Sequence, residues 1–125
     1  RPTQSVGTKT TPGTPEDYRN YIRGSYGEFS ASKPSCARFA LAWISDRSLC
    51  YLASGRPVVV SHSGPSSYLP DAEGLWRVRD AAEAARAVET IAADYANQSA
   101  KARALAEAHF SAPQIARHVL ETALP

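Results

Sequence analysis

The chain has no methionine, only two cysteines and no long apolar run. No segment approaches the roughly 18 apolar residues that a membrane-spanning helix requires, and no signal-peptide pattern is visible. We therefore expect a protein without a membrane span. Cys36 and Cys50 lack the spacing of a metal-binding or redox pair, which predicts two free thiols in a reducing, cytoplasmic compartment. A disulfide between them is the less favoured alternative.

Charge of either sign is also modest. The chain has 14 basic and 12 acidic residues, a net charge of +2, and its basic residues are scattered. This distribution argues against a nucleic-acid partner, which would require clustered positive charge. A length of 125 residues allows one domain with one hydrophobic core. Because the chain starts at Arg1 and lacks methionine, we expect it to be a piece of a longer protein.

Proline, glycine and threonine dominate the first 15 residues, RPTQSVGTKTTPGTP. Such a composition cannot bury a core, so residues 1–15 are predicted to be an extended lead-in. The remaining residues, 16–125, form the predicted domain. It begins with a short helix over Glu16–Arg23, whose apolar residues share one face.

Strands and helices alternate in the middle of the chain. The alternating apolar residues of Ala37–Ile44 predict a buried strand. Ser45 is a good N-cap residue for a following helix that stops at Gly55. The valine run in residues 56–60 predicts a strand covered on both faces, and LWRV, residues 75–78, predicts a second short strand.

The C-terminal third predicts long helices. Asp80 and Glu83 have the spacing of a capping box for a helix that starts at Ala81, and its apolar stripe continues through residue 110 with a break near Asn97. A serine cap followed by proline predicts a last helix that ends at about residue 123. The order of elements predicts an α/β fold, with a parallel sheet flanked by helices and long C-terminal helices. In such folds the ligand lies beyond the carboxyl ends of the strands.

The segment SHSGP, residues 61–65, allows a hydrolase interpretation. It resembles the small-x-Ser-x-small elbow of α/β-hydrolases, with Ser63 as nucleophile and with Asp94 and either His109 or His118 in the required order. Two observations argue against it. Prolines and serines follow where the elbow requires a helix, and the acid and the histidines fall within predicted helices.

Four segments together carry a resemblance to a known family. They are YIRGSYGEFSASK, DRSLCYLASGRPVVV, LPDAEGLWRV and DAAEAARAVETIAADYANQSAKARALAEAHF, and they span most of residues 18–122. In combination they are similar to the C-terminal, donor-binding half of bacterial GT-B glycosyltransferases. The resemblance implies a partial Rossmann-like domain that binds the diphosphate of a nucleotide sugar without a metal or other cofactor. It also implies a partner, the N-terminal acceptor domain of the parent protein.

The residue types at three places suit this ligand. The helix start at Asp46, Arg47 and Ser48 offers free N–H groups and a guanidinium for a phosphate. His62, Ser63 and Gly64 follow the valine strand in a loop whose backbone can approach a ligand closely. Glu28, Ser30 and Lys33 could supply a carboxylate for sugar or ribose hydroxyls and a second cation. Each also has a plainer structural role available, as a helix cap or a solvated loop residue, and Trp43 and Trp76 are interpreted most simply as core residues.

Three departures from the family pattern bear on catalysis. Cys50 and Ala42 stand where retaining members with an E-x7-E motif have glutamates, and His62 stands where the related subgroup has an aspartate in a polar run. The stretch FALA before Trp43 is apolar where relatives are polar. No catalytic residue is therefore assigned, and a non-catalytic interaction or scaffold module remains the alternative. Because the opening βαβ unit is expected to be missing, the fragment is expected either to bind nucleotide weakly or to expose a sheet edge that a homodimer or a domain swap covers.

Overall fold

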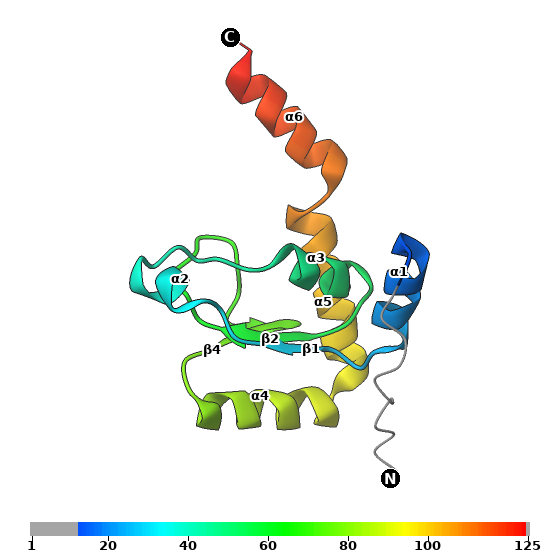
Figure 1. Cartoon of the computed structure of the whole chain (residues 1–125), viewed down its shortest axis with the longest axis vertical. Helices are drawn as coiled ribbons and strands as arrows, with labels where there is room; N and C mark the ends of the chain where they lie inside the picture. The colour runs from blue at the N-terminus through cyan, green and yellow to red at the C-terminus, as the bar shows by residue number, and fades with distance from the viewer. Residues whose placement is uncertain (1–12, 125) are drawn as a thin grey trace.

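The computed structural model describes residues 13–124. A four-stranded sheet with strand order β1-β2-β4-β3 forms its centre, and helices lie on both faces (Figure 1). Strands β1 (Glu28–Ser30), β2 (Val58–Ser61) and β4 (Leu75–Val78) are parallel, whereas β3 (Ala72–Glu73) pairs antiparallel with β4. The helices are α1 (Pro15–Gly24), α2 (Pro34–Arg38), α3 (Asp46–Ala53), α4 (Ala81–Ala93), α5 (Tyr95–His109) and α6 (Ala112–Ala123). The predicted α/β class with a parallel sheet is confirmed.

The valine run predicted to be covered on both faces is strand β2, the central strand of the sheet. Val58 and Val60 belong to a cluster with buried residues of α1, α3 and α5, whereas Val59 packs with Ala87 and Ile91 of α4 on the opposite face. Figure 1 shows α3 and α5 on one side of the sheet and α4 on the other. The core therefore has two layers with β2 between them.

Local signals placed most of the helix starts correctly. The Ser45 hydroxyl accepts a hydrogen bond from Arg47 N, and the Asp80 carboxylate accepts one from Glu83 N at 2.8 Å. The Glu83 carboxylate accepts a hydrogen bond from Arg79 N, whereas in a standard capping box it would accept one from the N-cap residue Asp80. The predicted helix Glu16–Arg23 is also present, within α1. Most of the predicted lead-in, residues 1–12, lies outside the described residues.

The predicted strand Ala37–Ile44 is wrong. Residues up to Arg38 belong to α2, and the chain then turns through Ala40 and Ala42, both with positive φ near 50°. The alternation has a different origin: Phe39, Leu41 and Trp43 are all exposed, so their spacing reflects a loop that directs its large side chains outward. Trp43, expected in the core, is 42% exposed.

The strand that does precede α3 is β1, which the sequence did not reveal. With three residues it is too short to show a period-2 pattern. β1 occupies one edge of the sheet, and its central residue Phe29 is 71% exposed. Within residues 13–124, β1 is thus an edge strand without a second neighbour in the sheet. The expected homodimer stays a prediction.

The predicted break in the long helical stripe is present at Asp94, three residues before Asn97. Asp94 has a non-helical backbone, with φ −139° and ψ 45°, and its carboxylate accepts a hydrogen bond from Asn97 at 2.7 Å. The reason for this position is tertiary. Helix α4 covers one face of the sheet and α5 packs with α3 on the other, so the chain must turn at the junction (Figure 1).

The predicted last helix is present as α6, which projects away from the sheet (Figure 1). None of its residues is buried, and Ile115, Val119 and Leu120 are all at least 45% exposed. No helix within residues 13–124 has the length and apolar character required to cross a bilayer.

These burial differences predict different costs for the same substitution. Leu52→Ala, at a site with 0% exposure, should lower the free energy of unfolding by about 2–5 kcal/mol, because it leaves a cavity between α3 and the sheet. Leu120→Ala on α6, where the leucine is 57% exposed, should change it by less than about 0.5 kcal/mol. Urea titration followed by circular dichroism measures both values. Equal losses in the two variants would contradict the described core.

Candidate functional site

An ion pair joins strand β1 to the start of helix α3. Arg47 Nε donates to Glu28 Oε1 at 2.8 Å, and the Ser30 hydroxyl donates to the same oxygen at 3.1 Å. The Glu28 side chain is 4% exposed and that of Arg47 is 48% exposed. Three residues predicted for the ligand site, from segments 19 positions apart, are thus in direct contact.

The pair fixes the direction of the guanidinium. Nε makes the bond to Glu28, and 48% of the Arg47 side chain remains exposed to solvent. The hydrogen bond that Arg47 donates to the carboxylate of Glu28 raises the pKa of Arg47 above its usual value, against the opposing effect of partial burial. Arg47 is therefore an oriented and permanently charged donor.

Two buried polar atoms near this pair lack a partner among the described residues. They are Glu28 Oε2 and the hydroxyl of Ser48, whose residue is 0% exposed. A buried acceptor or hydroxyl that forms no hydrogen bond costs free energy. Both atoms are inaccessible to solvent, so each is a buried polar group without compensation in this conformation.

Tyr18 of α1 is a neighbour that sequence reasoning placed only on an apolar helix face. Burial raises the pKa of its phenol, Cys50 and Tyr51 of α3 add to the increase, and Arg47 opposes it. Tyr18 thus lies close enough to α3 to affect the same site. Its only signal in the sequence was a tyrosine on the buried side of an amphipathic helix.

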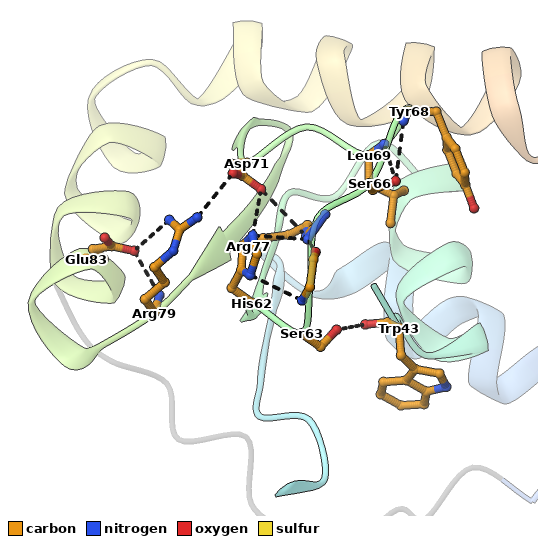
Figure 2. A network of polar contacts seen from close by, with 11 residues as sticks. Trp43, His62, Ser63, Ser66, Tyr68, Leu69, Asp71, Arg77, Arg79 and Glu83 are labelled. Carbon is orange, nitrogen blue, oxygen red and sulfur yellow. Dashed lines mark hydrogen bonds and ion pairs between the residues drawn. The ribbon is translucent and has the colours of Figure 1, made fainter. Parts of the chain in front are cut away.

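The loop after β2, in contrast, uses its polar groups within the protein (Figure 2). The Ser63 hydroxyl donates to the Trp43 carbonyl at 2.9 Å, and the Ser63 carbonyl accepts from Ala42 N at 2.9 Å. Gly64 has φ +131°, and a Cβ there would lie 2.5 Å from the Ala40 backbone. The close approach predicted for a ligand is therefore made by the chain's own residues 40–43.

Arg77 organises the rest of this loop and was not singled out from the sequence. Its side chain is 2% exposed, donates to the Gly64 carbonyl and lies 3.2 Å from His62 Nε2. Its Nε is 3.7 Å from Asp71 Oδ1, which also lies 3.6 Å from His62 Nε2. Figure 2 shows the side chains of Arg77, His62 and Asp71 converging. The available signal was an arginine at an inward position of LWRV.

His62 therefore sits in a positively charged surrounding. Burial, followed by the charges of Arg77 and Arg79, lowers the pKa of its imidazole, and Asp71 and Glu83 oppose this only in part. Its Nδ1 accepts a hydrogen bond from Gly64 N at 3.3 Å, an interaction that a protonated ring loses. The neutral imidazole is the form that the fold accommodates.

The remaining predicted residues are separated from the pair or act as caps. The Asp46 carboxylate accepts from Arg47 N at 2.9 Å, so it caps its own helix. Lys33 is exposed at the N-cap of α2 and makes no side-chain cap bond. The hydrolase alternative loses support, because the Ser63 hydroxyl is buried and donates to a carbonyl. The His109 ring lies against Tyr68 in a tilted arrangement, with 5.5 Å between ring centroids.

A hollow of about 260 Å³ lies at the carboxyl edge of the three parallel strands. It is lined by Phe29, Ser30, Ala31, Ser61, Val78, Arg79, Asp80, Ala81 and Ala84. The ligand crevice of α/β sheets is expected at this edge. Ser30 belongs both to this hollow and to the Glu28–Arg47 pair, so the two features are adjacent.

The described part of the chain offers no cluster of three metal-ligating side chains. Cys36 and Cys50 are both free, which agrees with the predicted thiols. Trp76 is partly buried and donates from Nε1 to Gln98 at 2.9 Å, as a residue packed beside a strand would.

Comparison of the chain with protein-family models, curated proteins and solved structures found no match. The resemblance to GT-B glycosyltransferases therefore rests on the residue patterns alone.

The environment of His62 predicts a pH-dependent stability. Since its pKa is lowered on folding, the unfolded chain takes up the proton first when the pH falls below about 6.5. Stability should be fully present above that pH and should decrease as the pH falls toward the folded-state pKa. Urea unfolding at several values from about pH 7.5 to 5.5 measures the slope.

Two histidine variants test whether the slope comes from this residue. His62→Gln should flatten it, whereas His118→Gln, on the exposed helix α6, should retain it. A slope that persists in His62→Gln would show that another group is responsible.

Proposed function

We propose that this chain is the nucleotide-sugar-binding part of a GT-B-type glycosyltransferase. The observation that carries the proposal is the Glu28–Arg47 pair, in which a buried carboxylate directs an exposed guanidinium at the first turn of α3. Both residues are among those that the family resemblance assigns to the ligand site. Ser30, which donates to Glu28, lies at the edge of the sheet where α/β folds bind ligands.

The chemistry follows from the groups at this place. The terminal NH₂ groups of Arg47 can bind two oxygens of a diphosphate, and the first turn of α3 adds backbone N–H groups and a positive dipole end. Glu28 and Ser48 support the site from within: the Glu28 carboxylate holds Arg47, and both Glu28 Oε2 and the Ser48 hydroxyl are buried. Lys33 is a further contact proposed from the sequence, whereas Ser63 and Gly64 use their polar groups within the protein and His62 contacts Arg77. Cationic and dipolar groups would stabilise the leaving diphosphate without a metal.

A non-catalytic Rossmann-like interaction module is the second candidate. It is favoured by the way Ser63 and Gly64 use their hydroxyl and carbonyl groups on Trp43, Ala42 and Arg77. It is also favoured by Cys50 and Ala42, which stand where related enzymes carry glutamates. Such a module would keep the fold and lose the donor.

An NMR titration of the chain with UDP, GDP and dTDP tests the proposal. Saturable amide shifts centred on residues 46–48 and 28–30 are expected, because the diphosphate should contact the start of α3. The preferred nucleotide would identify the donor base. No shift at millimolar concentrations of all three nucleotides would favour the interaction module.

A pair of arginine variants sharpens this test. Arg47→Gln should weaken nucleotide binding by at least about tenfold, since it removes a charged hydrogen-bond donor. Arg86→Gln changes the net charge equally at an exposed position of α4 and should leave the affinity unchanged. Equal weakening in both variants would indicate non-specific attraction of the phosphates.

A further inference from the structure

The connection between α2 and α3 carries three large apolar side chains that face solvent. We define the 39–43 loop as residues 39–43, FALAW. Phe39 is 64% exposed, Leu41 59% and Trp43 42%. Figure 2 shows the Trp43 indole pointing away from the polar network that holds its carbonyl. Large apolar residues gathered on one exposed loop indicate an interaction site.

The backbone of the loop is held in the conformation that exposes these side chains. Ala40 and Ala42 adopt positive φ values of 50° and 49°, which cost free energy for residues other than glycine. Hydrogen bonds from Leu41 N to the Cys36 carbonyl and from Ala42 N to the Ser63 carbonyl offset this cost. The outward direction of the side chains is thus built into the fold.

The charged residues within residues 29–45, Lys33 and Arg38, are both basic. The acidic residues Glu28 and Asp46 flank this range. The Arg38 guanidinium lies 5.6 Å from the centroid of the Phe39 ring, so a cation accompanies the apolar surface. An anionic partner with an apolar interior complements this combination.

The size of the loop distinguishes between partners. A stable protein interface needs about 800 Å² and some 20 to 30 residues on each side, whereas here three side chains stand on a five-residue loop. A lipid bilayer can bury a few apolar side chains without a large complementary surface, and tryptophan with flanking basic residues is typical of the bilayer interface. We propose that the 39–43 loop inserts into an anionic lipid surface, with Lys33 and Arg38 next to the headgroups. The proposal does not depend on the proposed function.

Vesicle co-sedimentation of the full chain tests the proposal. The probes are vesicles of phosphatidylcholine alone and vesicles in which about a third of the lipid is phosphatidylserine. The chain should partition at least about tenfold more strongly onto the anionic vesicles, and this preference should decrease with salt. Tryptophan emission should shift to the blue on binding as Trp43 leaves water. Absence of partitioning onto anionic vesicles would overturn the proposal.

Two leucines of similar exposure provide matched variants. Leu41→Asp should reduce partitioning at least about tenfold, because an acidic residue replaces the apolar tip. Leu120→Asp on α6, at 57% exposure, should not change it. Thermal unfolding confirms that both variants fold. If Leu120→Asp removes binding and Leu41→Asp does not, the membrane element is α6 and the proposal fails.

Sedimentation velocity without lipid tests the alternative that the 39–43 loop forms a protein–protein contact. The wild-type chain and Leu41→Asp should have the same sedimentation coefficient at any one concentration. A wild-type dimer that Leu41→Asp converts to monomer would assign the loop to a protein contact and overturn the proposal.

Discussion

Burial of strand β2 on both faces is the constraint on which the rest of the structure depends. Its three valines are at most 6% exposed, and they hold α3 and α5 on one face and α4 on the other. The neighbours β1 and β4 pair with β2 in a parallel register, so the carboxyl ends of all three strands meet at one edge. Ser30, Ser61 and Val78 line the hollow at that edge, and Ser30 also donates to Glu28.

Two buried charged side chains, Glu28 of β1 and Arg77 of β4, differ in their partners. Glu28 is neutralised by Arg47, which remains half exposed, so this pair presents a cation to solvent. Arg77 is buried almost completely, and its bonds to the Gly64 carbonyl and His62 are all internal. A buried ion needs such partners, because removal from water is costly. One ion pair therefore faces solvent, whereas the other network supports a loop.

Sequence reasoning succeeded where the cause of structure is local. The valine strand, LWRV and the caps at Ser45 and Asp80 were predicted from adjacent residues, and all are present. It failed where the cause is distant. Strand β1 exists because it pairs with β2. The break in the helical stripe was predicted, but its place at Asp94 depends on α5 having to reach the other face. For the site, residue chemistry identified Glu28 and Arg47 separately, but only the fold could show that they touch. The sequence also did not predict that Arg77, and not a ligand, would contact His62 and the Gly64 carbonyl.

Helix α6 is the helix of the described chain with the least protection from solvent. A helix of 12 residues is marginal in water unless another surface covers it, and none of the residues of α6 is buried. Its amide protons should therefore exchange with solvent almost as fast as those of a free peptide, whereas the amides of β2 exchange only when the whole domain opens. The exposed arm is also the segment that proteases would cut first, so purified material could lose α6 and retain the sheet and both polar networks intact.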